Sequence, residues 1–245
     1  MLLIPSAKLA MLYPWKTASQ TLQSRLEALG TRPYPKLHYF NQYLHKVVHQ
    51  HLTLADYRGL PQSQLGYELA VFVRNPYDRV FSGFQQALRD ISVLPRLNYP
   101  QPWIRELVMQ QVASLFSSLS RAQYNVDQWF QQLSLHEILD TGHSTCMCLH
   151  PVTYWTHQAG EQVADFIGKV EDFESDFSRL RERYSLPMTA GGSENRSDPT
   201  LARPDANNYL YTYRLHPRTI AKINDVFRDD FDLLGYERLS PAKTA

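Results

Sequence analysis

Residues 9–26 read LAMLYPWKTASQTLQSRL, an apolar run followed by a lysine, small hydroxyl residues and a helical pattern. This order predicts a buried strand over 8–14, a turn, and a helix over 18–29 that is capped by Gly30. A cation and several hydrogen-bond donors at a strand-to-helix turn are typical of a phosphate site. A P-loop would read G-x-x-x-x-G-K-[ST], but only the Lys-Thr pair at 16–17 matches, because no glycine precedes Gly30. The turn therefore predicts an anion site of another kind.

The composition is that of a folded protein with a local rather than a general attraction for anions. Of the 245 residues, 43% are hydrophobic and 12% aromatic, which allows a sizeable core. A net charge of +1 is too weak for general affinity to nucleic acid or anionic membranes. The apolar start is short and is interrupted by Pro5 and Lys8, and no run is long enough for a membrane span. We therefore expect a cytoplasmic protein of unknown oligomeric state.

Strands alternate with helices along the chain. Continuous apolar residues predict the clearest strand at 67–76, and Pro76 then begins a helix. Weaker patterns predict strands at 35–40 and within 162–173, and helices over 40–51, from Thr53 onward, over most of 93–160, after 173 and over 217–234. The order is typical of an α/β fold with a P-loop-like central parallel sheet and helices on both faces, in a single domain over 1–245.

A second anion-binding pattern follows the strand at 67–76. The segment VRNPYDRVFS places Arg74 at the strand end and Ser82 about two turns into the next helix, where a guanidinium and a hydroxyl suit a phosphate. Because Lys16 also follows a strand, we expect both cations at the ligand-binding edge of the sheet. Two separate sites fit a ligand with two separated anionic groups better than a triphosphate, whose phosphates are contiguous and need Mg²⁺.

Histidines and cysteines leave alternatives open. In HKVVHQH, His45 and His49 would share a helix face, a spacing that suits zinc, although Lys46 stands where a metalloprotease has its glutamate. Cys146 and Cys148 are too close for an easy disulfide and are expected to be free thiols in a reduced compartment. We favour no metal.

Other residues fit structural roles. Arg79 is expected to pair with Asp78 or Asp90 on the surface of its helix. The aromatic residues at 103–155 fit core packing better than carbohydrate platforms. The polar loop over 188–208 is long for a compact domain, which is typical of a functional or disordered segment.

The motifs resemble those of sulfotransferases that use 3′-phosphoadenosine 5′-phosphosulfate (PAPS), specifically the group with bacterial members and carbohydrate 2-O-sulfotransferases. KTASQT at 16–21 resembles the family's 5′-phosphosulfate loop, P-K-T-[AG]-G-T-S, and RNPYDRVFS at 74–82 resembles its 3′-phosphate motif, R-[ND]-P-x-x-R-x-x-S. Further similar stretches are HLTLADYR at 51–58, VADFIGKVEDFESDF at 163–177 and FRDDFDLLGYE at 227–237. The chain departs from the pattern at Trp15, which separates Pro14 from the lysine, at Ser19 in place of glycine and at Lys169 in place of arginine.

The resemblance implies a role for each matching residue, with PAPS as sulfate donor, 3′-phosphoadenosine 5′-phosphate (PAP) as product and no metal. Lys16 would meet the 5′-phosphate and the bridging oxygen, and Arg74 with Ser82 would hold the 3′-phosphate. The remaining donor contacts would be Thr17, Ala18, Ser19, Gln20 and Thr21, with Asn195, Arg196 and Ser197 as lid contacts. His51 aligns with the general base, and His49 is the runner-up, as base or as substrate contact.

The predicted function is transfer of the sulfuryl group from PAPS to an acceptor hydroxyl, on a carbohydrate or small alcohol, by in-line displacement. Acceptor determinants are expected in a helical subregion over 90–160 and in the loop at 188–208. One alternative is a non-catalytic module that binds PAP or carbohydrate. The other is a nucleotide kinase, which lacks support because the loop glycines are missing and Asp165 is the nearest candidate for a metal-holding aspartate.

Overall fold

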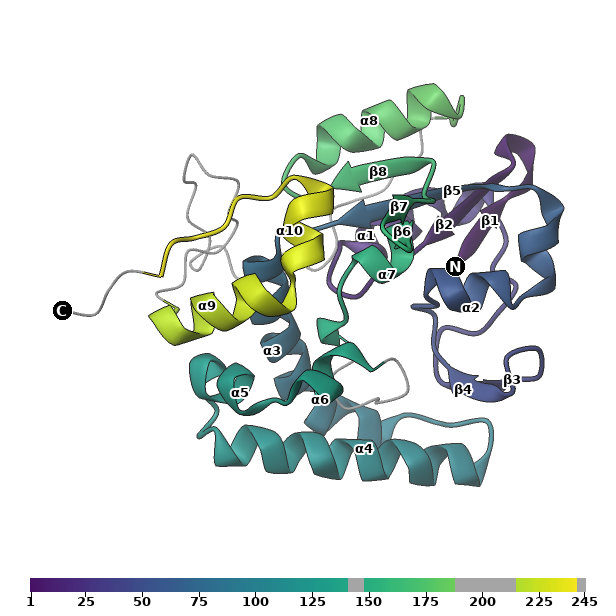
Figure 1. Cartoon of the computed structure of the whole chain (residues 1–245). Coiled ribbons are helices and arrows are strands. Elements are labelled where there is room, and N and C mark those ends of the chain that lie inside the picture. Colours follow the sequence, from purple (N-terminus) through teal and green to yellow (C-terminus); the bar gives the residue numbers. More distant parts are fainter. Residues whose placement is uncertain (141–147, 188–214, 242–245) are drawn as a thin grey trace. The chain divides into compact units, whose positions relative to one another are not determined.

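The computed structural model describes residues 1–140, 148–187 and 215–241 (Figure 1). The chain forms two compact units, one from 1–74 with 152–201 and one from 75–151 with 202–245, and each is described by itself below. Within the described ranges, no helix is long and apolar enough to cross a membrane.

The first unit is built on a four-stranded sheet with the strand order β1–β2–β5–β8. Its strands are β1 Leu2–Ile4, β2 Leu9–Leu12, β5 Glu68–Val73 and β8 Phe166–Lys169. Strands β2, β5 and β8 are parallel, and β1 is antiparallel to β2. The mostly parallel α/β sheet is therefore confirmed, whereas β1 was not predicted because three residues before a proline are too few to show a strand period.

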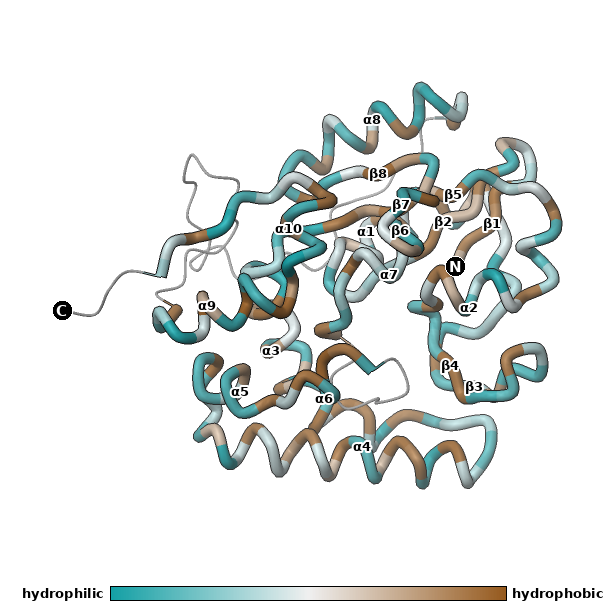
Figure 2. Tube along the Cα trace, in the orientation of Figure 1, coloured by the Kyte–Doolittle hydropathy of each residue, from teal (hydrophilic) through white to brown (hydrophobic). Residues whose placement is uncertain are grey.

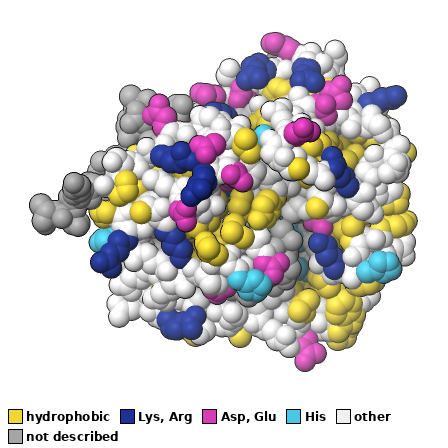
Figure 3. Space-filling model, viewed as in Figure 1, with side chains coloured by type: hydrophobic (Ala, Val, Ile, Leu, Met, Phe, Trp, Pro, Cys, Tyr) yellow, Lys and Arg dark blue, Asp and Glu magenta, His cyan; other side chains and the backbone are white. Residues whose placement is uncertain are grey.

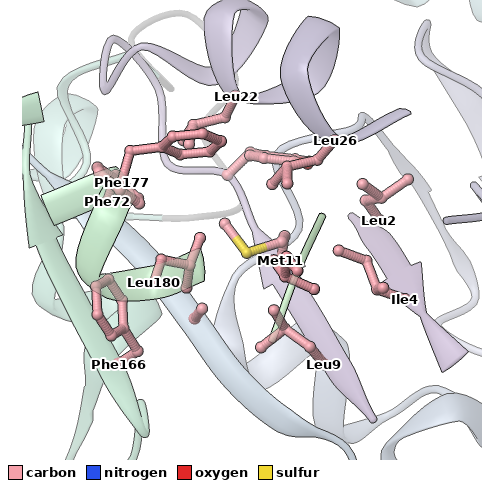
Figure 4. Close-up of a cluster of buried hydrophobic side chains, with 13 residues drawn as sticks. Leu2, Ile4, Leu9, Met11, Leu22, Leu26, Phe72, Phe166, Phe177 and Leu180 are labelled. Carbon is pink, nitrogen blue, oxygen red and sulfur yellow. The ribbon is translucent and has the colours of Figure 1, made fainter. Parts of the chain in front are cut away.

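One face of this sheet is covered by α1 (Ser19–Leu26) and α8 (Phe173–Arg183). Figure 4 shows how Met11 and Phe72 of the sheet meet Leu22 of α1 and Leu180 of α8 in one buried cluster. The strands run through hydrophobic sequence, whereas α8 alternates between hydrophobic and hydrophilic residues (Figure 2). The alternate strand residues, such as Ala10, Leu12 and Val71, are also fully buried, so the second face of the sheet is covered as well.

The remaining elements of the first unit are short. They are the hairpin β3 Tyr39–Asn41 and β4 Lys46–Val48, helices α2 Leu54–Arg58 and α7 Thr153–Thr156, the hairpin β6 His157–Gln158 and β7 Glu161–Gln162, and 3₁₀ helices at Pro5–Ala7, Glu27–Leu29 and Pro61–Leu65. Thr53 caps α2 through a reciprocal pair of hydrogen bonds with Asp56, which confirms the predicted helix start.

The prediction of a helix over 40–51 was wrong, and the predicted strand at 35–40 is reduced to β3. The side-chain oxygen of Asn41 accepts hydrogen bonds from the backbone N–H groups of Tyr43 and Leu44, at 2.9 and 3.1 Å, and so turns the chain. The chain then returns as β4, whose Val47 and Val48 favour a strand. This hairpin does not belong to the central sheet.

Gly30 does not act as the predicted helix cap. Helix α1 ends at Leu26, one 3₁₀ turn follows, and Gly30 has an extended φ of −142° rather than a left-handed conformation. A Cβ atom at Gly30 would lie 2.4 Å from the carbonyl oxygen of Leu3. The glycine is therefore required by close packing against β1, which the sequence pattern did not indicate.

The second unit is helical in its described part. Its helices are α3 Pro76–Val93, α4 Pro102–Arg121, α5 Val126–Gln132, α6 Leu135–Leu139, α9 Pro217–Val226 and α10 Arg228–Leu234, with a 3₁₀ helix at Leu94–Arg96. Helix α3 begins with Pro76 as predicted and contacts α4, α5 and α9. The helix expected over 217–234 is divided at Phe227, and Gly235 ends it with a left-handed φ of +64°.

Arg79 is not the surface residue that the sequence predicted. Its side chain is 1% exposed, and Nη1 donates to Oδ2 of Asp230 in α10 at 3.0 Å. Its Nη2 atom donates to the backbone carbonyl of His150. Arg79 therefore joins α3 to two distant segments of the same unit, a role that the local pattern of Asp78 and Asp90 did not reveal.

Candidate active site

The loop between β2 and α1 is curled in the manner of an anion-binding loop. Lys16 and Ala18 both have positive φ values, of +63° and +56°. Left-handed residues in a short loop curl the backbone so that N–H groups converge on one side. Ser19 begins α1, and the first four N–H groups of any α-helix have no intrahelical acceptor. The loop therefore offers backbone donors and a lysine at a helix N-terminus, which suits an anionic group.

Thr17 positions this loop through its side chain. The residue is fully buried, and its hydroxyl donates to the carbonyl oxygen of Pro14 at 3.0 Å. The hydroxyl proton is thus used inside the loop, so a contact of Thr17 with the predicted anion would have to use its backbone N–H. Ser19 and Thr21 are also largely buried, whereas Gln20 is exposed.

Arg74 lies at the same edge of the sheet as this loop. Strands β2 and β5 run parallel, with Leu12 opposite Val71, so that Lys16 and Arg74 follow the ends of neighbouring strands. Arg74 is 6% exposed, and its Nη1 donates to the backbone carbonyl of Lys16 at 3.4 Å. The structure thus places the two predicted phosphate-binding cations in contact through the loop backbone.

Four further residues were predicted to contact the sulfate donor, and they lie outside the part of the first unit described above. Ser82 is buried on α3 in the second unit. Asn195, Arg196 and Ser197 lie outside the described residues. Their roles stay predictions from the sequence motif.

His51 is attached to the beginning of the donor loop. Its ring is largely buried, and Nδ1 lies 2.6 Å from the backbone carbonyl oxygen of Tyr13. A carbonyl oxygen only accepts hydrogen bonds, so we assign the imidazole proton to Nδ1 and leave the lone pair on Nε2. The amide nitrogen of Gln50 lies 3.5 Å from that Nε2. A neutral histidine held in this tautomer has the form of a general base.

Two rings contact His51, and a third contacts one of these two. The Trp15 ring lies 4.0 Å from that of His51, and 4.7 Å from that of His49, measured between centroids. The rings of His49 and His51 stack at 4.8 Å, and His38 meets His49 at 5.0 Å. The sequence predicted His49 and His51 as candidates but did not predict Trp15 or His38. Trp15 was visible only as a departure from the family motif, and His38 had no local signal at all.

Burial lowers the basicity of the histidines in this cluster. Burial is the main cause that lowers the pKa of His51 to about 3, and the charge of Lys16 adds to it. Burial also lowers the pKa of His38 to about 4 and holds the pKa of His49 well below its ordinary value. All three imidazoles are therefore neutral at neutral pH.

The zinc spacing that we considered for His45 and His49 does not exist, because these residues do not share a helix. In the described part of the chain, no group of three or more His, Cys, Asp or Glu side chains is arranged to hold a metal ion. Cys148 is a buried free thiol as predicted, and Cys146 lies outside the described residues. On the face seen in Figure 3, Lys and Arg are interspersed with Asp and Glu, as a local rather than a general anion site requires.

Comparison with known protein families matches residues 1–237 to the sulfotransferase family, and the chain therefore belongs to this family. Comparisons with curated proteins and with solved structures gave no match. The resemblance found in the sequence is thus confirmed at the level of the family. The narrower likeness to carbohydrate 2-O-sulfotransferases stays a prediction.

Proposed function

We propose that this protein transfers the sulfuryl group of PAPS to an acceptor hydroxyl, giving PAP and a sulfate ester. Membership of the sulfotransferase family supports sulfuryl transfer in general. The observation that carries the specific proposal is the meeting of three groups at one edge of the sheet. These groups are the Lys16 loop, the Arg74 guanidinium that donates to the Lys16 carbonyl, and His51, which the Tyr13 carbonyl holds.

In this proposal the donor is bound by its two separated anionic ends. Lys16 and the backbone N–H groups of residues 17–21 bind the 5′-phosphosulfate, and Arg74 binds the 3′-phosphate. The sequence motif adds Ser82 to the 3′-phosphate contacts and Asn195, Arg196 and Ser197 to the lid. Like a P-loop, this donor site lies at the carboxyl edge of the sheet and binds phosphate, although it lacks the P-loop glycines.

His51 and Lys16 have complementary tasks in the transfer. The acceptor oxygen attacks sulfur in line with the bond between sulfur and the bridging oxygen, and that bond breaks with its electron pair passing to the phosphate of PAP. Lys16 stabilises the negative charge that develops on this oxygen. His51 takes the acceptor's proton on Nε2, while the Tyr13 carbonyl keeps the Nδ1 proton in place.

The low pKa of His51 keeps the imidazole unprotonated before the substrates bind, but it also makes the free imidazole a weak base. With its pKa lowered by burial to about 3, the imidazole is ready to accept a proton at neutral pH. The negative charges that the donor brings to Lys16 favour the protonated imidazole, and so increase its basicity during transfer. We assign no metal to this reaction.

We assign the acceptor to the class of carbohydrates or small alcohols, with His49 as a contact to it. Residues 90–160 and 188–208 would complete the acceptor side, so that residues 1–245 act as one sulfotransferase domain. We also propose a cytoplasmic location.

The test is transfer of radiolabelled sulfate from PAPS to a panel of neutral saccharides, acidic saccharides and small alcohols. We expect label in an ester with the wild type and with His45→Asn, a matched control at an exposed turn residue with φ of +50°. His51→Ala should bind PAP but not transfer label. Binding of PAP by the wild type without transfer to any acceptor would contradict the proposal and favour a non-catalytic module.

A further inference from the structure

Trp15 contacts the proposed base, His51, and belongs to the proposed donor loop. Its ring lies 4.0 Å from that of His51 at an interplanar angle of 30°, and 4.7 Å from that of His49 at 16°. Aromatic rings at such distances gain stacking energy beyond their burial. The indole therefore restricts how the His51 ring can rotate.

The same residue belongs to the donor loop. Trp15 lies between Tyr13, whose carbonyl holds Nδ1 of His51, and Lys16, whose carbonyl accepts from Arg74. The positive φ values of Lys16 and Ala18 show that this loop has a defined curl. A shift of the loop would thus move the Trp15 ring and the Tyr13 carbonyl together, and both are contacts of His51.

We propose that Trp15 is a positioning residue that fixes the His51 imidazole and couples its orientation to the donor loop. The inference rests on the proposed function, because it assigns His51 as the base and the loop as the donor site. It does not follow from the family motif, because Trp15 separates Pro14 from the lysine, where the motif has proline next to lysine.

Trp15 also shields His51 from water, which has a consequence for its titration. Burial is the main reason for the low pKa of His51, and the charges of the Met1 amino group, Lys16 and His38 lower it further. The His49 ring also stacks on that of His51, and the hydrogen bond to the Tyr13 carbonyl raises the pKa of His51. Removing the indole lets water reach the ring and so moves the pKa of His51 up, toward its ordinary value of about 6.5.

The first experiment needs no acceptor. Carbon–proton NMR of the histidine Cε1–H signals is recorded against pH for the wild type, Trp15→Leu and Trp15→Phe, with His51→Ala identifying the signal. We expect the pKa of the His51 signal to lie well above the wild-type value in Trp15→Leu. In Trp15→Phe, which keeps a ring, it should stay near the wild-type value. We also expect saturating PAP to shift this signal in the wild type but much less in Trp15→Leu.

The second experiment measures transfer and PAP binding in the same proteins, with the best acceptor of the panel. Trp15→Leu should bind PAP within about threefold of the wild type but transfer about ten- to a hundredfold more slowly, because a misplaced base loses its alignment. Trp15→Phe should recover most of the rate. Phe173→Leu serves as control, since this ring stacks on Phe177 and contacts Phe72 instead.

The outcomes separate this inference from the function on which it rests. If the wild type binds no PAP, the proposed function fails before Trp15 is tested. If the wild type binds PAP and transfers sulfate, but Trp15→Leu matches its rate and its His51 titration, only the Trp15 inference is overturned. Should Trp15→Leu not fold, Trp15→Met replaces the ring with a flexible apolar chain, and the same results are expected of it.

Discussion

Nδ1 of His51 lies 2.6 Å from the backbone carbonyl oxygen of Tyr13, and these two residues are 38 positions apart in the chain. The contact joins the end of the β3–β4 hairpin to the end of β2. Because the carbonyl accepts only, it selects the tautomer in which Nε2 is free of a proton. The proposed base and the donor loop are thereby connected by a single hydrogen bond.

The pH dependence of transfer should reflect the buried state of His51. Since burial lowers its pKa to about 3, the base remains unprotonated as the pH falls from neutrality. We expect kcat/KM, which reports the free enzyme, to stay level from about pH 8 down to about pH 5. A decrease centred near the ordinary histidine pKa of about 6.5 would show that His51 is not held as described.

Replacing Arg74 should weaken the binding of PAP. The guanidinium is buried at the sheet edge, and loss of a charged hydrogen bond costs about 1.5–3 kcal/mol. We therefore expect Arg74→Ala to raise the Kd for PAP by about ten- to a hundredfold in calorimetric titration. Arg58→Ala, at an exposed position in α2, is the control and should bind as the wild type does. Equal affinity of the two variants would remove Arg74 from the donor site.

The stability of the protein should fall in mild acid, in part because of His38. Its pKa is lowered by burial to about 4 in the folded state, against about 6.5 when unfolded. The unfolded chain therefore binds more protons below about pH 6.5, and stability is lost as the pH falls from there toward about 4. Each such histidine contributes a slope of up to about 1.4 kcal/mol per pH unit.

Urea unfolding at several pH values measures this slope. His38→Phe removes one titrating group. It should therefore reduce the slope of the free energy of unfolding against pH by up to about 1.4 kcal/mol per pH unit. His45→Asn, at an exposed turn position, should leave it as in the wild type. A slope that is identical in His38→Phe and the wild type would mean that His38 is not buried as a neutral imidazole.

The ion pair of Arg79 and Asp230 should be a strong stability determinant of the second unit. Both side chains are almost fully buried, with 1% and 0% exposed. Removal of one member of a buried pair leaves an uncompensated charge and typically costs about 3–5 kcal/mol. We expect Asp230→Ala to lower the free energy of unfolding by this amount, measured by urea denaturation. The double variant Arg79→Met with Asp230→Leu should recover a large part of it, whereas no recovery would argue against charge burial as the cause.

Local sequence signals were sufficient for several strands and helix starts. Each of these signals is contained in a few neighbouring residues. They are the apolar runs of β2 and β5, the proline that begins α3 and the Thr53 cap of α2. The convergence of Lys16 and Arg74 was predictable as well, because parallel strands bring their carboxyl ends to one edge.

The surroundings of the proposed base were not predictable in the same way. The spacing of apolar residues over 40–51 fits a helix, but the Asn41 turn and the valines of β4 favour a hairpin. Only that hairpin brings His38 close to His49, and His51 close to Trp15. Such contacts join segments distant in sequence, so no local period indicates them.

The most direct test of the central claim is calorimetric titration of the purified protein with PAP, and separately with ADP and Mg²⁺. We predict micromolar binding of PAP without metal and much weaker binding of ADP, because the Lys16 loop and Arg74 are suited to two separated anionic groups. Binding of ADP with Mg²⁺ as tight as that of PAP would contradict this account. The loop at YPWKTASQT would then be an unusual nucleotide site of the kinase type.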